Sequence, residues 1–138
     1  MVFLLLDLQR ATHATLHRLT TDLAELRLAP SELNALANLA RRPDAASTVS
    51  ELGAAAGTRP TTLTSILDRL EQRGLVSRAP HERDRRTVVV RLTPPGTTIA
   101  TRVLEAMADV ERRALASLPP DAAERAATVL RALTEAAA

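Results

Sequence analysis

The sequence predicts a mainly α-helical fold that carries one small β-hairpin, and three observations support this. Apolar residues recur at three- and four-residue steps through most of the chain, as at Leu63, Ile66 and Leu70. Between residues 75 and 92 the pattern changes to the alternation that is typical of strands. Aromatic residues make up only 1% of the 138 residues, so a core has to consist of Leu, Val, Ile and Ala, which suits closely packed helices.

Prolines and capping residues mark the first three helices. The first helix is expected over residues 3–26, and the second over residues 30–42, where the following proline stops it. Thr48-Val-Ser-Glu51 has the capping-box pattern, in which Thr48 accepts from a backbone N–H three residues on and Glu51 reaches back. The sequence therefore predicts a short third helix that starts after Thr48 and ends at Gly57.

A fourth helix and a hairpin follow. The helix is expected to begin near Pro60 and to end at Gly74, and together with the third helix it forms a helix-turn-helix candidate. Residues 75–78 and 87–92 are expected to form the two strands of a hairpin, with residues 79–86 as its tip. The chain should end in two further helices, a long one that Thr93-Pro94 caps and that runs to about residue 117, and a last one that starts at Pro119-Pro120.

Composition restricts the function. There is no cysteine, which excludes disulfides and thiolate metal sites, and there is no tyrosine and only three histidines, so the usual catalytic nucleophiles and bases are scarce. We expect no enzymatic activity and no cofactor. No apolar run approaches the roughly 18 residues of a membrane span, and the apolar stretch before Asp7 lacks the basic region of a signal peptide. We therefore expect a cytoplasmic protein that does not bind membranes.

Positive charge is concentrated in the middle of the chain. The formal net charge is +2, but residues 59–91 hold eight arginines against four acidic residues, and both flanking segments are slightly acidic. A basic segment between acidic flanks is compatible with a solvated surface, and it is also what a nucleic-acid partner would require.

The face of the fourth helix opposite its leucines is polar and made largely of short side chains. Short hydroxyl side chains let a helix lie deep in the DNA major groove, where Ser and Thr bond either base type. The arginines of this helix lie where they could reach phosphates. A plain amphipathic surface helix would show the same pattern, so the helix alone does not decide. The candidate DNA contacts here are Arg59, Thr61, Thr62, Thr64, Ser65, Arg69 and Arg73.

The hairpin tip adds a second basic feature. His81-Glu-Arg-Asp-Arg-Arg86 has three arginines within four residues, on a loop that projects from the sheet. Such a loop can enter a narrow minor groove, where guanidinium groups are favoured. Asp84 could fix the direction of the Arg86 guanidinium. A solvated turn is the alternative, but the helix-turn-helix directly before the loop favours DNA binding. The candidate contacts in the tip are Arg83, Asp84, Arg85 and Arg86.

Four segments together are similar to MarR-family winged helix-turn-helix transcriptional regulators, over nearly the whole chain. They are Thr48-Val-Ser-Glu-Leu52, residues 59–76 with their Gly-Leu-Val end, Asp84-Arg-Arg86, and Val90-Arg-Leu-Thr-Pro94. The resemblance implies one domain over residues 1–138, with a winged DNA-binding lobe at 28–93 between dimerisation helices at 1–27 and 94–138. It also implies that residues 59–73 are the recognition helix and that Arg86, oriented by Asp84, reads the minor groove.

The same resemblance implies a homodimer on a near-palindromic operator in double-stranded DNA, most commonly a repressor that a small organic ligand releases. Two alternatives stay open. A protein–protein interaction module on a winged-helix scaffold would have a net-neutral recognition face, unlike this basic segment. A metal-responsive regulator could use His13 and His17, which lie four residues apart on one helix face, but zinc usually needs three or four ligands and only His81 and carboxylates remain.

Overall fold

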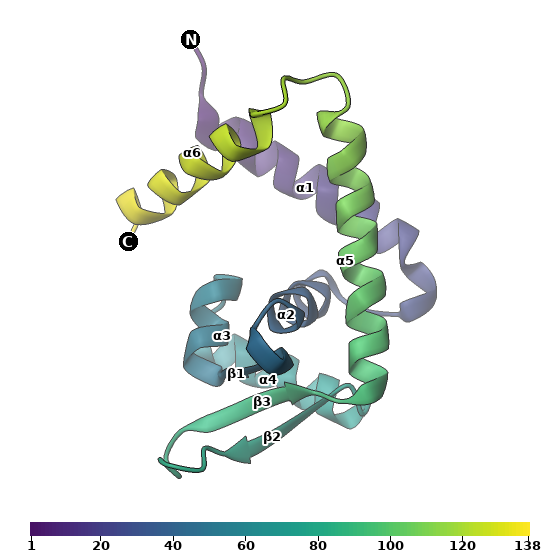
Figure 1. The fold of residues 1–138 in the computed structure, drawn as a ribbon, viewed down its shortest axis with the longest axis vertical. Coiled ribbons are helices and arrows are strands. Elements are labelled where there is room, and N and C mark those ends of the chain that lie inside the picture. The colour runs from purple at the N-terminus through teal and green to yellow at the C-terminus, as the bar shows by residue number, and fades with distance from the viewer. The chain divides into compact units, whose positions relative to one another are not determined.

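The computed structural model describes all residues, 1–138. The chain divides into two compact units, Met1–Ala106 and Met107–Ala138, and the boundary lies within a long helix. The first unit contains four helices, a small antiparallel sheet and the beginning of the long helix, and the second contains the end of that helix and one more (Figure 1). The expected mainly α fold with a small β-sheet is confirmed.

The helices of the first unit follow the capping signals closely. Their bounds are α1 Leu4–Asp22, α2 Pro30–Ala40, α3 Val49–Ala56 and α4 Pro60–Gln72, with 3₁₀ turns at Ala24–Leu26 and Pro43–Ala45. The first helix is shorter than predicted, because the chain leaves α-helical geometry at Leu23 and forms the 3₁₀ turn, which ends at Arg27 in a left-handed conformation with φ 52°. The last residues of the predicted first helix, Ala24–Leu26, therefore form a 3₁₀ turn that precedes α2.

Only half of the predicted capping box forms at α3. The hydroxyl of Thr48 accepts the Glu51 backbone N–H at 3.1 Å, as expected. The Glu51 carboxylate, however, pairs with Arg42 at the end of α2 and does not reach back to Thr48. At the start of α2, by contrast, a glutamate does reach back to the N-cap residue, because the Glu32 carboxylate accepts the Ala29 N–H at 3.0 Å. Glu51 therefore joins two helices.

The sheet has three strands, one more than the predicted hairpin. The strands are β1 Ala46–Thr48, β2 Val76–Pro80 and β3 Val88–Leu92, in the order β1-β3-β2, and all neighbours are antiparallel. Strand β1 was not predicted, because three residues are too few to show an alternating pattern. Val90 pairs with Ser47 on one side and with Arg78 on the other. The hairpin β2–β3 projects beyond the helices of this unit, and its tip spans residues 81–87 (Figure 1).

An aliphatic core holds α2, α3 and α4 against the sheet. The largest fully buried side chains are Leu33, Leu36, Leu39, Leu52, Leu63, Ile66, Leu67, Leu70, Val90 and Val103. Burying a side chain of this size contributes about 1.5–3 kcal/mol. The apolar positions of α4, which are Leu63, Ile66, Leu67 and Leu70, are all in this set. The opposite face of α4 therefore has to lie at the surface.

The long helix α5 runs over Pro94–Leu115, and the last helix, α6, over Ala122–Ala136. Thr93 caps α5 as predicted, since its hydroxyl accepts the Gly96 N–H at 3.1 Å. Near its start α5 buries Gly96, Ala100 and Val103, whereas α6 has no buried residue. No helix is both long and apolar enough to cross a membrane.

Candidate nucleic-acid interface

The surface of α4 is polar along the side that faces away from the core. Pro60 starts the helix, as is common for proline in the first turn, and the left-handed Gly74 follows its end with φ 71°. The predicted contact residues Arg59, Thr61, Thr62, Thr64, Ser65 and Arg69 are all exposed. The hydroxyl of Thr64 donates to the Pro60 carbonyl at 3.0 Å, which leaves its oxygen as an acceptor. The structure thus presents one side of α4 as short hydroxyls with arginine at both ends.

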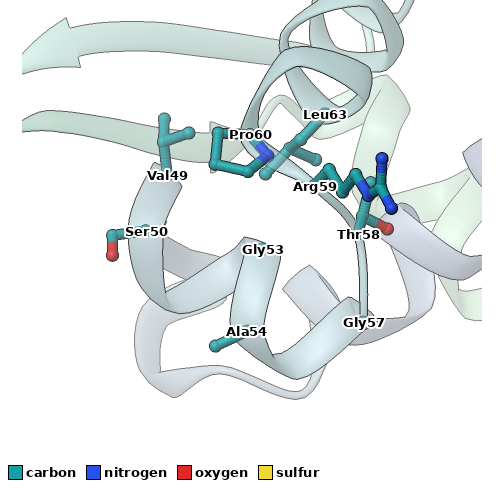
Figure 2. A pocket seen from close by; sticks show the side chains of 9 residues that line it. All are labelled: Val49, Ser50, Gly53, Ala54, Gly57, Thr58, Arg59, Pro60 and Leu63. Carbon is teal, nitrogen blue, oxygen red and sulfur yellow. The ribbon is translucent and has the colours of Figure 1, made fainter.

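Between α3 and the beginning of α4 the surface is hollowed by a cavity of about 560 Å³. Val49, Ser50 and Ala54 line it from α3, and Pro60 and Leu63 from α4 (Figure 2). Gly57 and Thr58 form the turn between the two helices. The two helices of the predicted helix-turn-helix are therefore both present, and the polar side of α4 is exposed.

The hairpin tip is ordered by Asp84, but not in the way that the sequence suggested. The Asp84 carboxylate accepts the backbone N–H of Arg86 at 3.0 Å and the hydroxyl of Thr87 at 3.2 Å. The expected pairing of Asp84 with the Arg86 guanidinium is not formed, because a carboxylate two residues before an N–H closes a tight turn with the backbone. Asp84 fixes the path of the loop, while Arg83, Arg85 and Arg86 stay exposed.

The tip and the helix meet at a second cavity of about 470 Å³. Thr64 and Leu67 line it from α4, and Arg86 and Val88 line it from the hairpin. Two predicted contact residues from distant parts of the sequence, Thr64 and Arg86, therefore lie on one continuous surface.

Arg73 makes contacts that the sequence interpretation did not include. It was predicted to hold a phosphate, and in the structure its guanidinium donates to the Leu26 carbonyl at 2.7 Å and to the Arg27 carbonyl at 3.0 Å. These carbonyls end the 3₁₀ turn, where backbone dipoles leave partial negative charge that a cation stabilises. Arg59, Arg69 and Arg73 are all exposed, and of the three only Arg73 has its guanidinium bonded to backbone carbonyls elsewhere in the fold.

Arg78 on β2 was missed by sequence reasoning. It donates to Asp68 at 2.6 Å and to Glu71 at 3.1 Å, both on α4. The bond from Arg78 lowers the pKa of Glu71, and the bonds from Glu71 and Asp68 raise the pKa of Arg78. Asp68 and Glu71 lie three residues apart and so share a helix face, which was the available signal. The pairing ties α4 to the wing, and the one positive charge of Arg78 offsets part of the charge of the two carboxylates of α4.

The histidines do not form a metal site within the chain. His13 and His17 are exposed on α1, and no group of three or more His, Cys, Asp or Glu side chains is placed to hold an ion. The structure adds nothing that favours the metal-responsive alternative.

A helix-turn-helix with an exposed hydroxyl-rich face, followed directly by an arginine-tipped hairpin, defines a winged helix-turn-helix domain of the DNA-binding class. The model of the MarR family matches residues 28–87. The transcriptional regulator PecS of Dickeya dadantii is 40% identical over 112 residues, which are 80% of this chain and 64% of PecS. The chain thus matches somewhat less than two thirds of the length of PecS.

The transcriptional repressor MdtR of Bacillus subtilis is 28% identical over 138 residues, covering 97% of this chain and 88% of MdtR. Among solved structures, NadR in complex with 4-hydroxyphenylacetate has a TM-score of 0.85 at 22% identity, over 96% of this chain and 93% of NadR, which shows the common fold. The winged-helix segment of the chain, residues 28–87, thus matches the MarR family, and the chain as a whole is similar to transcriptional regulators.

Proposed function

We propose that this protein is a transcriptional repressor that binds double-stranded DNA sequence-specifically as a homodimer. In this proposal the exposed hydroxyls of α4 contact base edges in the major groove, and Arg86 enters the neighbouring minor groove. Arg59 and Arg69 bind phosphates, which position the protein without reading sequence. A near-palindromic operator follows from the two-fold symmetry of the dimer, with half-sites about 34 Å apart.

One observation carries the proposal. The exposed hydroxyl face of α4 and the arginines of the wing tip form a continuous surface, because Thr64 and Arg86 line the same cavity. The two acids of α4, Asp68 and Glu71, are both paired with Arg78. The surface therefore presents unpaired positive charge beside uncharged donors and acceptors. An interaction module with a net-neutral recognition face would lack that excess.

Selection from a random pool of duplex DNA tests the function directly. The purified chain is incubated with the pool at about 150 mM salt, a concentration at which non-specific binding is weakened by screening. We expect enrichment of a near-palindromic sequence whose half-sites are about 10 base pairs apart, centre to centre. Failure to enrich any sequence, with binding that depends on salt alone, would reject sequence-specific regulation.

We further propose that a small organic acid releases the repressor from DNA. The related fold of NadR was solved with 4-hydroxyphenylacetate. Phe3 is the only aromatic residue of this chain and is 59% exposed, so the ligand should be held by aliphatic contacts and arginines and not by stacking. In a thermal-shift screen of organic acids, a ligand that binds the folded state raises the apparent stability. The same compound should weaken operator binding, and a stabilising compound without that effect would contradict ligand release.

Salt dependence should distinguish the arginines of α4 from those of the wing. Arg69→Ala is expected to weaken binding to all sequences about equally and to lower the salt slope by about one unit, because one phosphate contact is lost. Arg86→Ala should weaken binding most where the DNA flanking the half-site is A·T-rich, because narrow minor grooves attract guanidinium groups. Titrations over a salt series on A·T-rich and G·C-rich flanks measure both effects. Equal losses for Arg86→Ala on the two flanks would contradict the minor-groove role.

The wing tip should need Asp84 for its shape. Asp84→Ala adds a positive charge to the tip but removes the acceptor of the Arg86 N–H and of the Thr87 hydroxyl. Loss of a bond of this kind costs about 1 kcal/mol, so operator binding is expected to weaken about fivefold. Glu82→Ala is the matched control, since it changes the charge of the same loop equally at an exposed position, and it should leave binding unchanged or slightly tighter. Tighter binding by both variants would show that the tip acts through bulk charge.

A further inference from the structure

The three residues that follow α4 are bonded to two other parts of the first unit. The Arg73 guanidinium donates to the carbonyls of Leu26 and Arg27, in the 3₁₀ turn after α1. The carbonyl of Gly74 accepts the hydroxyl of Thr93, and the carbonyl of Leu75 accepts the Thr93 backbone N–H at 3.1 Å. Thr93 immediately precedes α5. The end of α4 is thus bonded on one side to the end of α1 and on the other to the start of α5.

The 3₁₀ turn Ala24–Leu26 is also bonded to α5 and packed into the core. Glu25 pairs with Arg102 of α5, and a backbone hydrogen bond, followed by the bond to Arg102, lowers the pKa of Glu25. Leu23, Leu26 and Leu28 are buried around the turn, with at most 7% of each exposed. The end of α1, the end of α4 and the start of α5 therefore form a closed triangle of contacts. We call residues 24–27, 73–75 and 93–102 the junction.

The junction has few ways to move. The turn ends at Arg27 with a positive φ of 52°, a conformation that a residue other than glycine adopts only when its surroundings impose it. Gly96 lies directly on the Leu75 carbonyl, where a Cβ would be 1.8 Å from the oxygen. A bidentate guanidinium on two successive carbonyls is also more restrictive than a single bond, because its donors are held in one plane. These contacts fix the end of α4 against the turn after α1 and against the start of α5.

We propose that Arg73 is a positioning residue that sets the orientation of the recognition helix relative to α1 and α5, and thereby the spacing of half-sites that the dimer accepts. This inference rests on the proposed function of the chain as a dimeric DNA-binding regulator. Arg73 itself contacts no DNA. It acts by holding the end of α4 on the turn after α1, so that the two recognition helices of a dimer stay at one separation.

A charge-preserving substitution separates this role from phosphate binding. Arg73→Lys retains the positive charge but cannot bond two carbonyls with a planar fork. A phosphate contact would survive this change almost unaltered. If Arg73 instead positions α4, the change should disturb its role, and affinity for the selected operator should fall about tenfold. This is within the usual range for coupling between sites. Arg41→Lys is the matched control, because Arg41 is the exposed C-cap of α2 as Arg73 is the exposed C-cap of α4, and no DNA contact is proposed for it. It should behave like the unaltered protein.

The decisive measurement is the dependence of affinity on half-site spacing. Operators with one base pair inserted or removed between the half-sites are compared with the selected operator. The unaltered protein should discriminate strongly among them, and Arg73→Lys should discriminate several-fold less, with an unchanged salt slope. A variant that was merely less stable would lose affinity equally on all spacings. Unchanged discrimination in Arg73→Lys, or a salt slope that falls by about one unit in Arg73→Ala, would overturn the proposal.

Hydrogen exchange of the free protein keeps the test independent of DNA binding. If Arg73 holds the turn, the amides of residues 24–28 should exchange faster in Arg73→Lys than in Arg41→Lys, because local opening becomes easier. Exchange that is equal in the two variants would overturn the proposal even if the protein binds its operator. If instead the unaltered protein selects no operator, the proposed function fails, while faster exchange would still establish the bond of Arg73 to the turn. Circular dichroism confirms that each variant is folded.

Discussion

Gly96→Ala is expected to lower the free energy of unfolding by about 3 kcal/mol, at the upper end of what overpacking costs. A Cβ at this position would lie 1.8 Å from the Leu75 carbonyl oxygen and 2.8 Å from its carbon. The obstacle is backbone, and it is held in place by the Thr93 N–H at 3.1 Å, so it cannot turn aside as a flexible side chain would. In thermal unfolding the midpoint should fall by about 10 °C.

Gly53→Ala is the matched control, because it is also a helical glycine of the same unit. A Cβ there would meet the Thr58 carbonyl oxygen at 3.3 Å and the Leu63 Cδ2 at 3.4 Å, which is tight but not impossible. Alanine gains up to about 1 kcal/mol over glycine within a helix, which offsets the crowding. The midpoint of this variant should stay within a few degrees of the original. If Gly96→Ala unfolded at the same temperature as Gly53→Ala, the close approach of α5 to the Leu75 carbonyl would be refuted.

The helices could be predicted because each depends on local signals. The apolar period of α4 at Leu63, Ile66 and Leu70 predicted which face is buried, and the structure confirms all three. The Thr93 cap and the left-handed Gly74 were also predictable, since caps and helix-ending glycines depend on residues a few positions apart. The exposed positions of the candidate contact residues follow from the same period.

The contacts that join elements could not be predicted in this way. Arg73 bonds carbonyls 46 and 47 residues away, and sequence reasoning assigned it to phosphate because an arginine at a helix end looks the same in both roles. Arg78 was not noticed, because its partners Asp68 and Glu71 lie on another element. Asp84 was assigned to the Arg86 side chain when it bonds the Arg86 backbone. In each case the residue type was informative, but its partner depends on tertiary structure.

The large exposed apolar side chains lie almost entirely near the two ends of the chain, at residues 1–6 and 118–130, which we call the terminal segments. Of the ten such residues, only Val88 lies outside them, and the others are Met1, Val2, Phe3, Leu4, Leu5, Leu6, Leu118, Val129 and Leu130. The beginning of α1 and the whole of α6 bury no large side chain within the chain. A run of exposed apolar residues such as residues 1–6 usually marks an interface. A second copy of the chain is the partner that the proposed function requires.

Leu5→Glu is therefore expected to convert the proposed dimer to a monomer at micromolar concentration. Leu5 is 59% exposed in the single chain, so the substitution should be tolerated by the fold of the monomer, whereas in a dimer it would bury an unpaired carboxylate at a cost of several kcal/mol. Affinity for the full operator should fall at least 100-fold, because the two half-sites are then bound independently. Affinity for an isolated half-site should change little. Sedimentation gives the oligomeric state, and titration with both DNAs gives the affinities.

Val88→Glu is the matched control for the dimer, since it places the same charge at an exposed apolar residue, 40% exposed, on β3 and outside the terminal segments. This variant should remain dimeric, although its carboxylate beside the wing would weaken binding to full operator and half-site alike by repelling phosphates. The two variants thus separate loss of dimerisation from loss of contact with DNA. A monomeric Val88→Glu, or a Leu5→Glu that still sediments as a dimer, would place the interface on another part of the chain. A stable monomer of the unaltered protein would remove the symmetric operator from the proposal altogether.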